Sequence, residues 1–188
     1  MNARWLIVVA ALSMASCRAD SYPALVITKV VLGTATTDPG PPAVTTCSYD
    51  QGADEFSYAH IDPTANTGGT VGVVVDNKLV SQVTQNPQFR TDTTAFHPHQ
   101  VVADYEVVDG SQSIMGQIIP VSGTIPGGGT GAVLVPFFAP IQTSTLSGMV
   151  RVTFHVEGKL DDGSKARTGN HEYIFVTCSG AGCNSPCL

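Results

Sequence analysis

Charged residues are scarce in this chain, because Asp, Glu, Lys and Arg together make up only 13% of its 188 residues. The 9 basic residues form no cluster, and the 15 acidic residues outnumber them. This balance argues against nucleic acid as a partner and against electrostatic docking on anionic lipid. The sequence also lacks apolar residues at helical spacing over three turns from residue 17 onward, and no apolar run is long enough to span a bilayer.

The chain begins with the features of a secretory signal peptide. Arg4 precedes an apolar run over residues 5–12, and the small residues Ala15 and Ser16 come directly before Cys17. The stretch resembles a bacterial lipobox, in which the cysteine is acylated and becomes the first residue of the mature chain. That resemblance implies a diacylglycerol and an N-acyl chain on Cys17, which together anchor a protein stably. An ordinary signal peptide with an incidental cysteine is the alternative.

The expected organisation is a signal peptide over residues 1–16, a short lipid-anchored tether over 17–22 and one domain over 23–188. Without Arg4 the chain has a net charge of −7. Because the tether is only a few residues long, the domain should lie close to the membrane. Arg18 stands where some enteric lipoproteins carry an aspartate for inner-membrane retention, so the lipobox resemblance favours the outer membrane of a bacterial cell envelope.

Four further cysteines predict two disulfide bonds in an exported protein, namely Cys47, Cys178, Cys183 and Cys187. Cys47 lies in an early predicted strand and Cys178 ends the last one. We therefore expect Cys47 to pair with the tail, with Cys178 as the first choice of partner and Cys183 or Cys187 as the next. The remaining two tail cysteines would pair locally. A metal knuckle is the alternative, although the spacings lack the paired C-x2-C of zinc sites.

Short β-branched runs separated by Gly and Pro predict an all-β domain. Residues 149–157 and 101–108 alternate apolar and polar side chains, as half-exposed strands do. Residues 171–178 should form a strand that pairs with residues 149–157. The turn between them is expected at residues 160–164, where Gly163 can take a positive φ. Residues 24–32 are expected to form a strand that is largely buried on both sides, and residues 114–121 a strand with a break near Gly116. The other expected strands are 44–49, 55–61, 71–75 and 132–138.

Segments rich in Pro and polar residues are expected to be loops: residues 36–42, 85–94 and 97–99. Asp76-Asn77 is either a turn or a bend in one continuous strand. Together the strands predict an antiparallel β-sandwich of about seven to nine strands, of the immunoglobulin or fibronectin type, after an N-terminal signal helix.

A family resemblance rests on several motifs besides the lipobox. They are Cys47-Ser48-Tyr49, Val75-x-Asn77-x-Leu79, and a final hairpin from Asp162-Gly163 through Asn170-His171-Glu172 to the cysteine-rich tail. In these features the mature chain is similar to uncharacterised envelope lipoproteins of myxobacteria-like bacteria. The resemblance implies an immunoglobulin-like sandwich and no known activity, so it assigns no functional residue.

The most suggestive motif for metal chemistry is His97-Pro98-His99. In an extended chain, residues two apart point the same way, so both imidazoles could reach one copper or zinc ion. The motif lacks the further ligands that follow closely in copper/zinc superoxide dismutases, and His60, His155 and His171 are scattered over more than 100 residues. The alternative is a proline-stiffened loop.

The other motifs do not match known catalytic or ligand-binding patterns. Asp161-Asp162 and Asp54-Glu55 are adjacent carboxylates, which tend to diverge, and Asp161-Asp162-Gly163 lacks the D-x-D-x-D series of a calcium loop. The glycines of residues 127–131 are not followed by G-K-[ST], and no serine stands in G-x-S-x-G. Two function classes remain: a non-enzymatic interaction or structural module that binds an envelope protein or glycan, and a metal-handling protein that uses His97 and His99.

Overall fold

The computed structural model describes residues 24–42, 44–61, 69–79, 94–139 and 146–178, and these residues form strands and no helix. None of them therefore belongs to a helix able to cross a membrane. The strands, in chain order, are β1 Leu25–Val31, β2 Thr34–Asp38, β3 Val44–Ser48, β4 Tyr58–Ile61, β5 Thr70–Asn77, β6 Phe96–Val107, β7 Ser113–Pro120, β8 Thr130–Pro136, β9 Met149–Leu160, β10 Lys165–Arg167 and β11 His171–Thr177. The predicted signal helix and tether lie outside the described residues.

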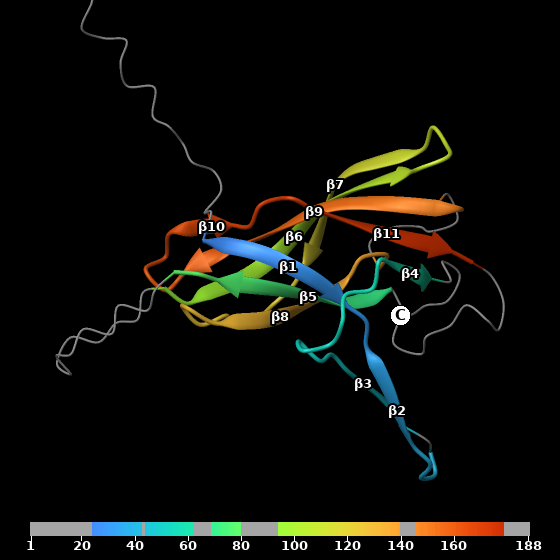
Figure 1. Cartoon of the computed structure of the whole chain (residues 1–188), viewed down its shortest axis with the longest axis horizontal. Coiled ribbons are helices and arrows are strands. Elements are labelled where there is room, and N and C mark those ends of the chain that lie inside the picture. Colours follow the sequence, from blue (N-terminus) through green and yellow to red (C-terminus); the bar gives the residue numbers. More distant parts are fainter. Residues whose placement is uncertain (1–23, 43, 62–68, 80–93, 140–145, 179–188) are drawn as a thin grey trace, which may run out of the picture.

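Two sheets and a separate two-stranded ladder make up the fold. The larger sheet has the order β4-β11-β9-β6-β7, with β10 also paired to β9, and the smaller one has the order β1-β5-β8. All described pairings are antiparallel except that of β11 with β4. In Figure 1 the β2–β3 ladder projects away from the two sheets.

The two sheets share one hydrophobic core. The alternation predicted for residues 101–108 and 149–157 is confirmed, because every second side chain from Val101 to Val107 and along β9 is buried. The smaller sheet contributes residues of β1, β5 and β8 to the same cluster. Since burial of apolar area is the main favourable term in folding, this shared layer holds the sheets face to face. Its members on β6, β9 and β5 are Val101, Ala103, Tyr105, Val107, Val150, Val152, Phe154, Val156, Val71, Val73 and Val75.

Aromatic rings and one hydrogen bond tie the layers together just after β8. Phe137 lies edge-on to Phe154 of β9, with ring centroids 4.7 Å apart, and Phe138 lies edge-on to Phe175 of β11 at 5.0 Å. The Tyr105 hydroxyl of β6 donates to the Phe137 carbonyl. Such edge-to-face pairs add to the area that the rings bury.

The loop predicted for residues 36–42 is wrong in its first half. Thr34–Asp38 is strand β2, which pairs with β3 from Thr34↔Ser48 to Asp38↔Val44. Its side chains are mostly exposed, so no apolar alternation marks it in the sequence. Backbone pairing defines this strand, and the hydroxyls of Thr46 and Ser48 on β3 add hydrogen bonds to the carbonyls of Thr36 and Thr34.

The loop predicted at His97-Pro98-His99 is also wrong, since all three residues belong to β6. The register with β9 shifts between Pro98 and Gln100, so His99 is an extra residue in the ladder. Proline is tolerated in a sheet at such a bulge because it has no backbone N–H to donate. The bulge therefore lets a Pro-containing segment continue the strand.

Other local predictions have mixed outcomes. Asp76 and Asn77 continue β5 without a turn. Gly163 has φ +81° in the predicted turn, as expected. The predicted break near Gly116 is a bulge opposite Asp104 within a continuous β7, where Gly116 has φ +67°. β1 is largely buried, as expected, and Thr28 at its bulge is the one exposed side chain of the strand.

Candidate functional site

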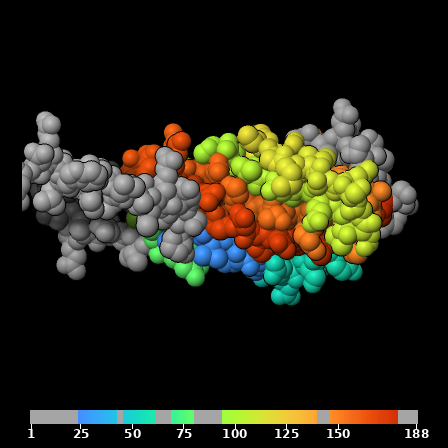
Figure 2. All heavy atoms as spheres, turned by 90° about the horizontal axis from the view of Figure 1, so that it is seen from above, coloured from blue at the N-terminus to red at the C-terminus, as the bar shows by residue number. Residues whose placement is uncertain are grey.

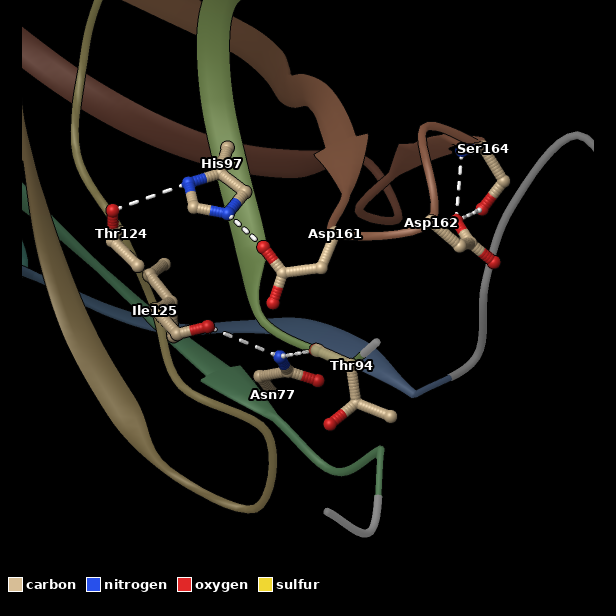
Figure 3. A network of polar contacts seen from close by, with 8 residues as sticks. All are labelled: Asn77, Thr94, His97, Thr124, Ile125, Asp161, Asp162 and Ser164. Atoms are coloured by element: carbon tan, nitrogen blue, oxygen red, sulfur yellow. Dashed lines mark hydrogen bonds and ion pairs between the residues drawn. The ribbon is translucent and has the colours of Figure 1, made fainter. Parts of the chain in front are cut away.

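His97 is the centre of a chain of polar contacts at the end of the larger sheet where β6 begins and β9 ends (Figure 3). Its Nε2 lies 2.6 Å from Asp161 Oδ1, and its Nδ1 lies 3.2 Å from Thr124 Oγ1. A hydroxyl, an imidazole and a carboxylate in series form the arrangement that activates a nucleophile in hydrolases. Here the His97 and Asp161 side chains are 43% and 35% exposed, whereas acyl transfer relies on a water-excluded site. We therefore assign these contacts among Thr124, His97 and Asp161 a structural role, which is to join three segments of the protein.

The neighbouring carboxylate, Asp162, closes the turn between β9 and β10. Its Oδ1 accepts hydrogen bonds from the Ser164 backbone N–H at 2.8 Å and from the Ser164 hydroxyl at 2.5 Å (Figure 3). These bonds hold the pKa of Asp162 below its ordinary value. Asp161 and Asp162 thus diverge, as expected for adjacent carboxylates, and each satisfies a local partner.

A third residue of this region, Asn77, is fully buried at the end of β5. Its amide nitrogen donates to the carbonyls of Thr94 at 2.7 Å and Ile125 at 3.3 Å (Figure 3). Its Oδ1 accepts a hydrogen bond from the Leu79 N–H. A buried amide satisfied in this way fixes the segments around it. The sequence suggested only a turn or a bend here and did not predict these hydrogen bonds of Asn77.

The five histidines do not converge on one ion. His97 has both ring nitrogens engaged by Thr124 and Asp161, and His99 is the exposed extra residue at the bulge. His60 packs against Tyr58, and His171 packs against Phe154. No group of three or more His, Cys, Asp or Glu able to hold a metal occurs within the described ranges.

A second polar cluster surrounds Glu157 on the outer face of the larger sheet. Its carboxylate lies 3.1 Å from His155 Nε2 and accepts a hydrogen bond of 2.6 Å from Gln100 Nε2. Burial raises the pKa of Glu157, but these two contacts and the charges of His155 and His99 outweigh it, so the pKa is lowered. The cluster stabilises an ionised carboxylate between paired strands.

A surface hollow lies at the opposite end of the larger sheet. It has a volume of about 330 Å³ and lies between the β6–β7 turn and the residues that lead into β9. Its lining residues are Val107, Asp109, Gly110, Ser111, Gln112, Ser147, Gly148 and Met149. Figure 2 shows the yellow-green β6–β7 hairpin at this end of the molecule.

Backbone hydrogen bonds fix both walls of the hollow. On one side, Val107 N donates to Gln112 O at 3.0 Å and Gly110 N donates to Val107 O at 3.1 Å, which closes the turn. On the other side, Gly148 N donates to Thr177 Oγ1 at 2.6 Å. The walls are joined where Val108 N donates to Met149 O at 2.9 Å. The hollow is therefore preformed, as ligand sites usually are.

Four polar side chains on this lining make no hydrogen bond or ion pair with the protein, as far as the described residues go: Asp109, Ser111, Gln112 and Ser147. This contrasts with the His97 end, where the polar groups of His97, Thr124 and Asp161 bind one another. Groups that are held by a fixed backbone and have no protein partner can bind an external molecule at no cost in broken protein contacts.

Exposed apolar side chains lie on the rim of the hollow and along β7. Met149, on its rim, is 41% exposed, and β7 carries Met115 at 67% and Ile118 at 59%. Among the described strands β7 pairs with β6 alone, so its other edge has no strand partner there. Partly apolar surface next to polar groups is common at recognition sites.

The predicted cysteine sites are described only in part. Cys47 lies in β3, and Cys178 follows β11 with its Sγ 3.7 Å from the Ile61 carbonyl oxygen. Neither is a free thiol. Cys17, Cys183 and Cys187 lie outside the described residues, so the lipidation and the pairing of the cysteines stay predictions.

The comparisons with known proteins add no relative: no protein-family model, curated protein or solved structure matches this chain.

The sequence could have revealed half of the hollow. Asp109-Gly110-Ser111 follows one predicted strand and precedes another, which is the pattern of a hairpin turn. The other wall comes from residues 147–149, almost 40 positions later. No local pattern brings these two segments together, because the pairing of β6 with β9 does so.

Proposed function

We propose that this chain is an exported, lipid-anchored protein of the bacterial cell envelope that binds another envelope component and does not act by catalysis. The observation that supports binding is the preformed hollow at the β6–β7 turn, with four polar side chains that the described protein leaves unpartnered. The sequence from Arg4 to Cys17 supports export and anchoring. Outer-membrane placement follows from Arg18 after the acylated cysteine.

The proposed architecture is an immunoglobulin-like sandwich. Two sheets with a shared core and mostly antiparallel pairing support it. In such folds, loops at the ends of the sandwich are held by a rigid scaffold and commonly carry the binding function. The hollow has this position, because it lies where β6, β7 and β9 meet their connecting segments.

The anchoring is tested by metabolic labelling with a fatty-acid analogue in cells that express the full chain from Met1. We expect label on the wild type and none on Cys17→Ser, which should leave the membrane fraction. If the wild type takes up no label and Cys17→Ser still fractionates with membranes, the anchor assignment is wrong.

The binding function is tested by capture of envelope extract on the full chain. We expect a specific component that the wild type retains and that Asp109→Asn loses. The matched control is Asp162→Asn at the opposite end of the sheet, where an amide oxygen can still accept the Ser164 hydrogen bonds. Equal retention by all three proteins would contradict the assignment of binding to the hollow.

A further inference from the structure

We propose that the hollow between the β6–β7 turn and the start of β9 binds a neutral, hydroxyl-rich ligand, namely a saccharide unit of an envelope glycan. This inference rests on the proposed binding function and names the chemistry of its ligand. The hollow measures about 330 Å³, which lies at the small end of the range for small-molecule sites, about 300 to 1,000 Å³.

The polar groups of the lining match hydroxyl groups. The Asp109 carboxylate only accepts hydrogen bonds, the Gln112 amide both donates and accepts, and the hydroxyls of Ser111 and Ser147 do either. A sugar ring presents several neighbouring hydroxyls, each of which both donates and accepts. Hydrogen bonds from hydroxyls to a carboxylate are charge-assisted and therefore stronger than those between neutral groups.

The charges of the lining argue against ionic ligands. No Lys, Arg or His lines the hollow, so nothing there would neutralise a phosphate, a sulfate or a carboxylate. The nearby Arg151 pairs with Glu106 at 3.2 Å. A single carboxylate is also too little for a hard cation such as Ca²⁺, which takes six to eight oxygen ligands, often several of them charged.

Apolar groups complete the match. Met149 lines the hollow with an exposed side chain, whereas Val107 backs it from the core. A methionine adapts its shape to an irregular surface, so Met149 can pack against the C–H face of a sugar ring. Polar groups that fix orientation and an apolar wall that supplies contact area together form the usual composition of a small-molecule site.

The test uses the full lipidated chain, extracted in a detergent without a sugar headgroup and applied to an array of neutral oligosaccharides of glucose, galactose, mannose and N-acetylglucosamine. The free oligosaccharide that binds best is then titrated calorimetrically into the wild type, Asp109→Asn, Ser147→Ala and the control Asp162→Asn. The two test variants remove one group from each wall of the hollow. We expect each to weaken binding about tenfold or more and the control to bind like the wild type.

Two results would overturn the inference: no neutral oligosaccharide binds, or binding is the same in Asp109→Asn and Ser147→Ala as in the wild type. If no oligosaccharide on the array binds, but the wild type captures an envelope protein that Asp109→Asn does not capture, the ligand class is wrong and the proposed function stands. If neither saccharide nor protein depends on Asp109, both fail.

Discussion

The Tyr105 hydroxyl on β6 donates a buried hydrogen bond of 2.5 Å to the backbone carbonyl of Phe137, just after β8. This bond links β6 of the larger sheet to the segment that follows β8 of the smaller one, and both residues belong to the shared core. A second buried tyrosine, Tyr173 on β11, offers a contrast, because its buried hydroxyl has no hydrogen-bond partner among the residues that the structure describes. Burial raises the pKa of both phenols, so both hydroxyls keep their proton at ordinary pH.

The two tyrosines should respond in opposite ways to removal of the hydroxyl. Tyr105→Phe should lower the free energy of unfolding by about 1 to 3 kcal/mol, because a buried hydrogen bond is lost. Tyr173→Phe should leave it unchanged or raise it by about 1 kcal/mol, because an unsatisfied polar group is removed. Urea denaturation with the disulfides intact measures both. A large loss of stability in Tyr173→Phe would show that its hydroxyl has a partner.

The pH dependence of stability should contain a contribution from His171. Burial lowers the pKa of this imidazole below its ordinary value of about 6.5, and the charges of Glu55 and Glu172 offset the effect only in part. As pH falls below about 6.5, the unfolded chain binds a proton before the folded chain does, so the free energy of unfolding should decrease. His171→Phe keeps the edge-on contact with Phe154 and removes the titrating group. Denaturation between pH 7.5 and 5 should therefore show a shallower decline in this variant, and an unchanged slope would contradict the account.

Much of the fold follows from the sequence where one face of a strand is buried. The inward residues of β6 and β9 are read directly from the alternation of apolar and polar residues. Where both faces of a strand are exposed, as on β2, no such signal exists. Where a proline enters a long strand at a bulge, as at Pro98, the local signal predicts a loop.

The polar sites could be predicted less well, for a different reason. The contact of His97 with Asp161 joins residues 64 positions apart, and the hollow joins segments almost 40 positions apart. Both depend on the register of β6 against β9. A sequence pattern describes residues that are close along the chain. It therefore identifies candidate residue types but does not predict that residues far apart in the sequence lie in contact.

Two glycines should differ in their tolerance of alanine. A Cβ at Gly158 would lie 2.3 Å from the His97 carbonyl oxygen and 2.6 Å from a ring carbon of Phe96, so β6 and β9 would have to separate. We expect Gly158→Ala to cost about 3 kcal/mol. Gly163 has a positive φ but open space around it, so Gly163→Ala should cost only about 1 kcal/mol of backbone strain. Thermal denaturation ranks the two, and the reverse order would contradict the described β6–β9 register.

A disulfide bond should link Cys47 to a cysteine of the C-terminal tail. A bridge from Cys47 to Cys178 or beyond closes a loop of about 130 residues or more, which the chain-entropy model values at about 4 to 5 kcal/mol. Cys47→Ser should therefore lower the unfolding temperature markedly, and reduction of the wild type should have a similar effect. Non-reducing peptide mapping identifies the partner. A peptide in which Cys47 is linked only to another chain would contradict the intramolecular pairing.

The claim that the chain binds an envelope component at the hollow is tested most directly in living cells. A photo-crosslinking amino acid is placed at Ser111, on the lining of the hollow, and in a separate variant at Asp162, in the turn at the other end of the sheet. After illumination, the full chain is isolated and its mass is compared with that of an unilluminated sample. We predict an adduct of defined mass from position 111 and none from position 162; no adduct at 111, or equal adducts at both, would contradict the claim.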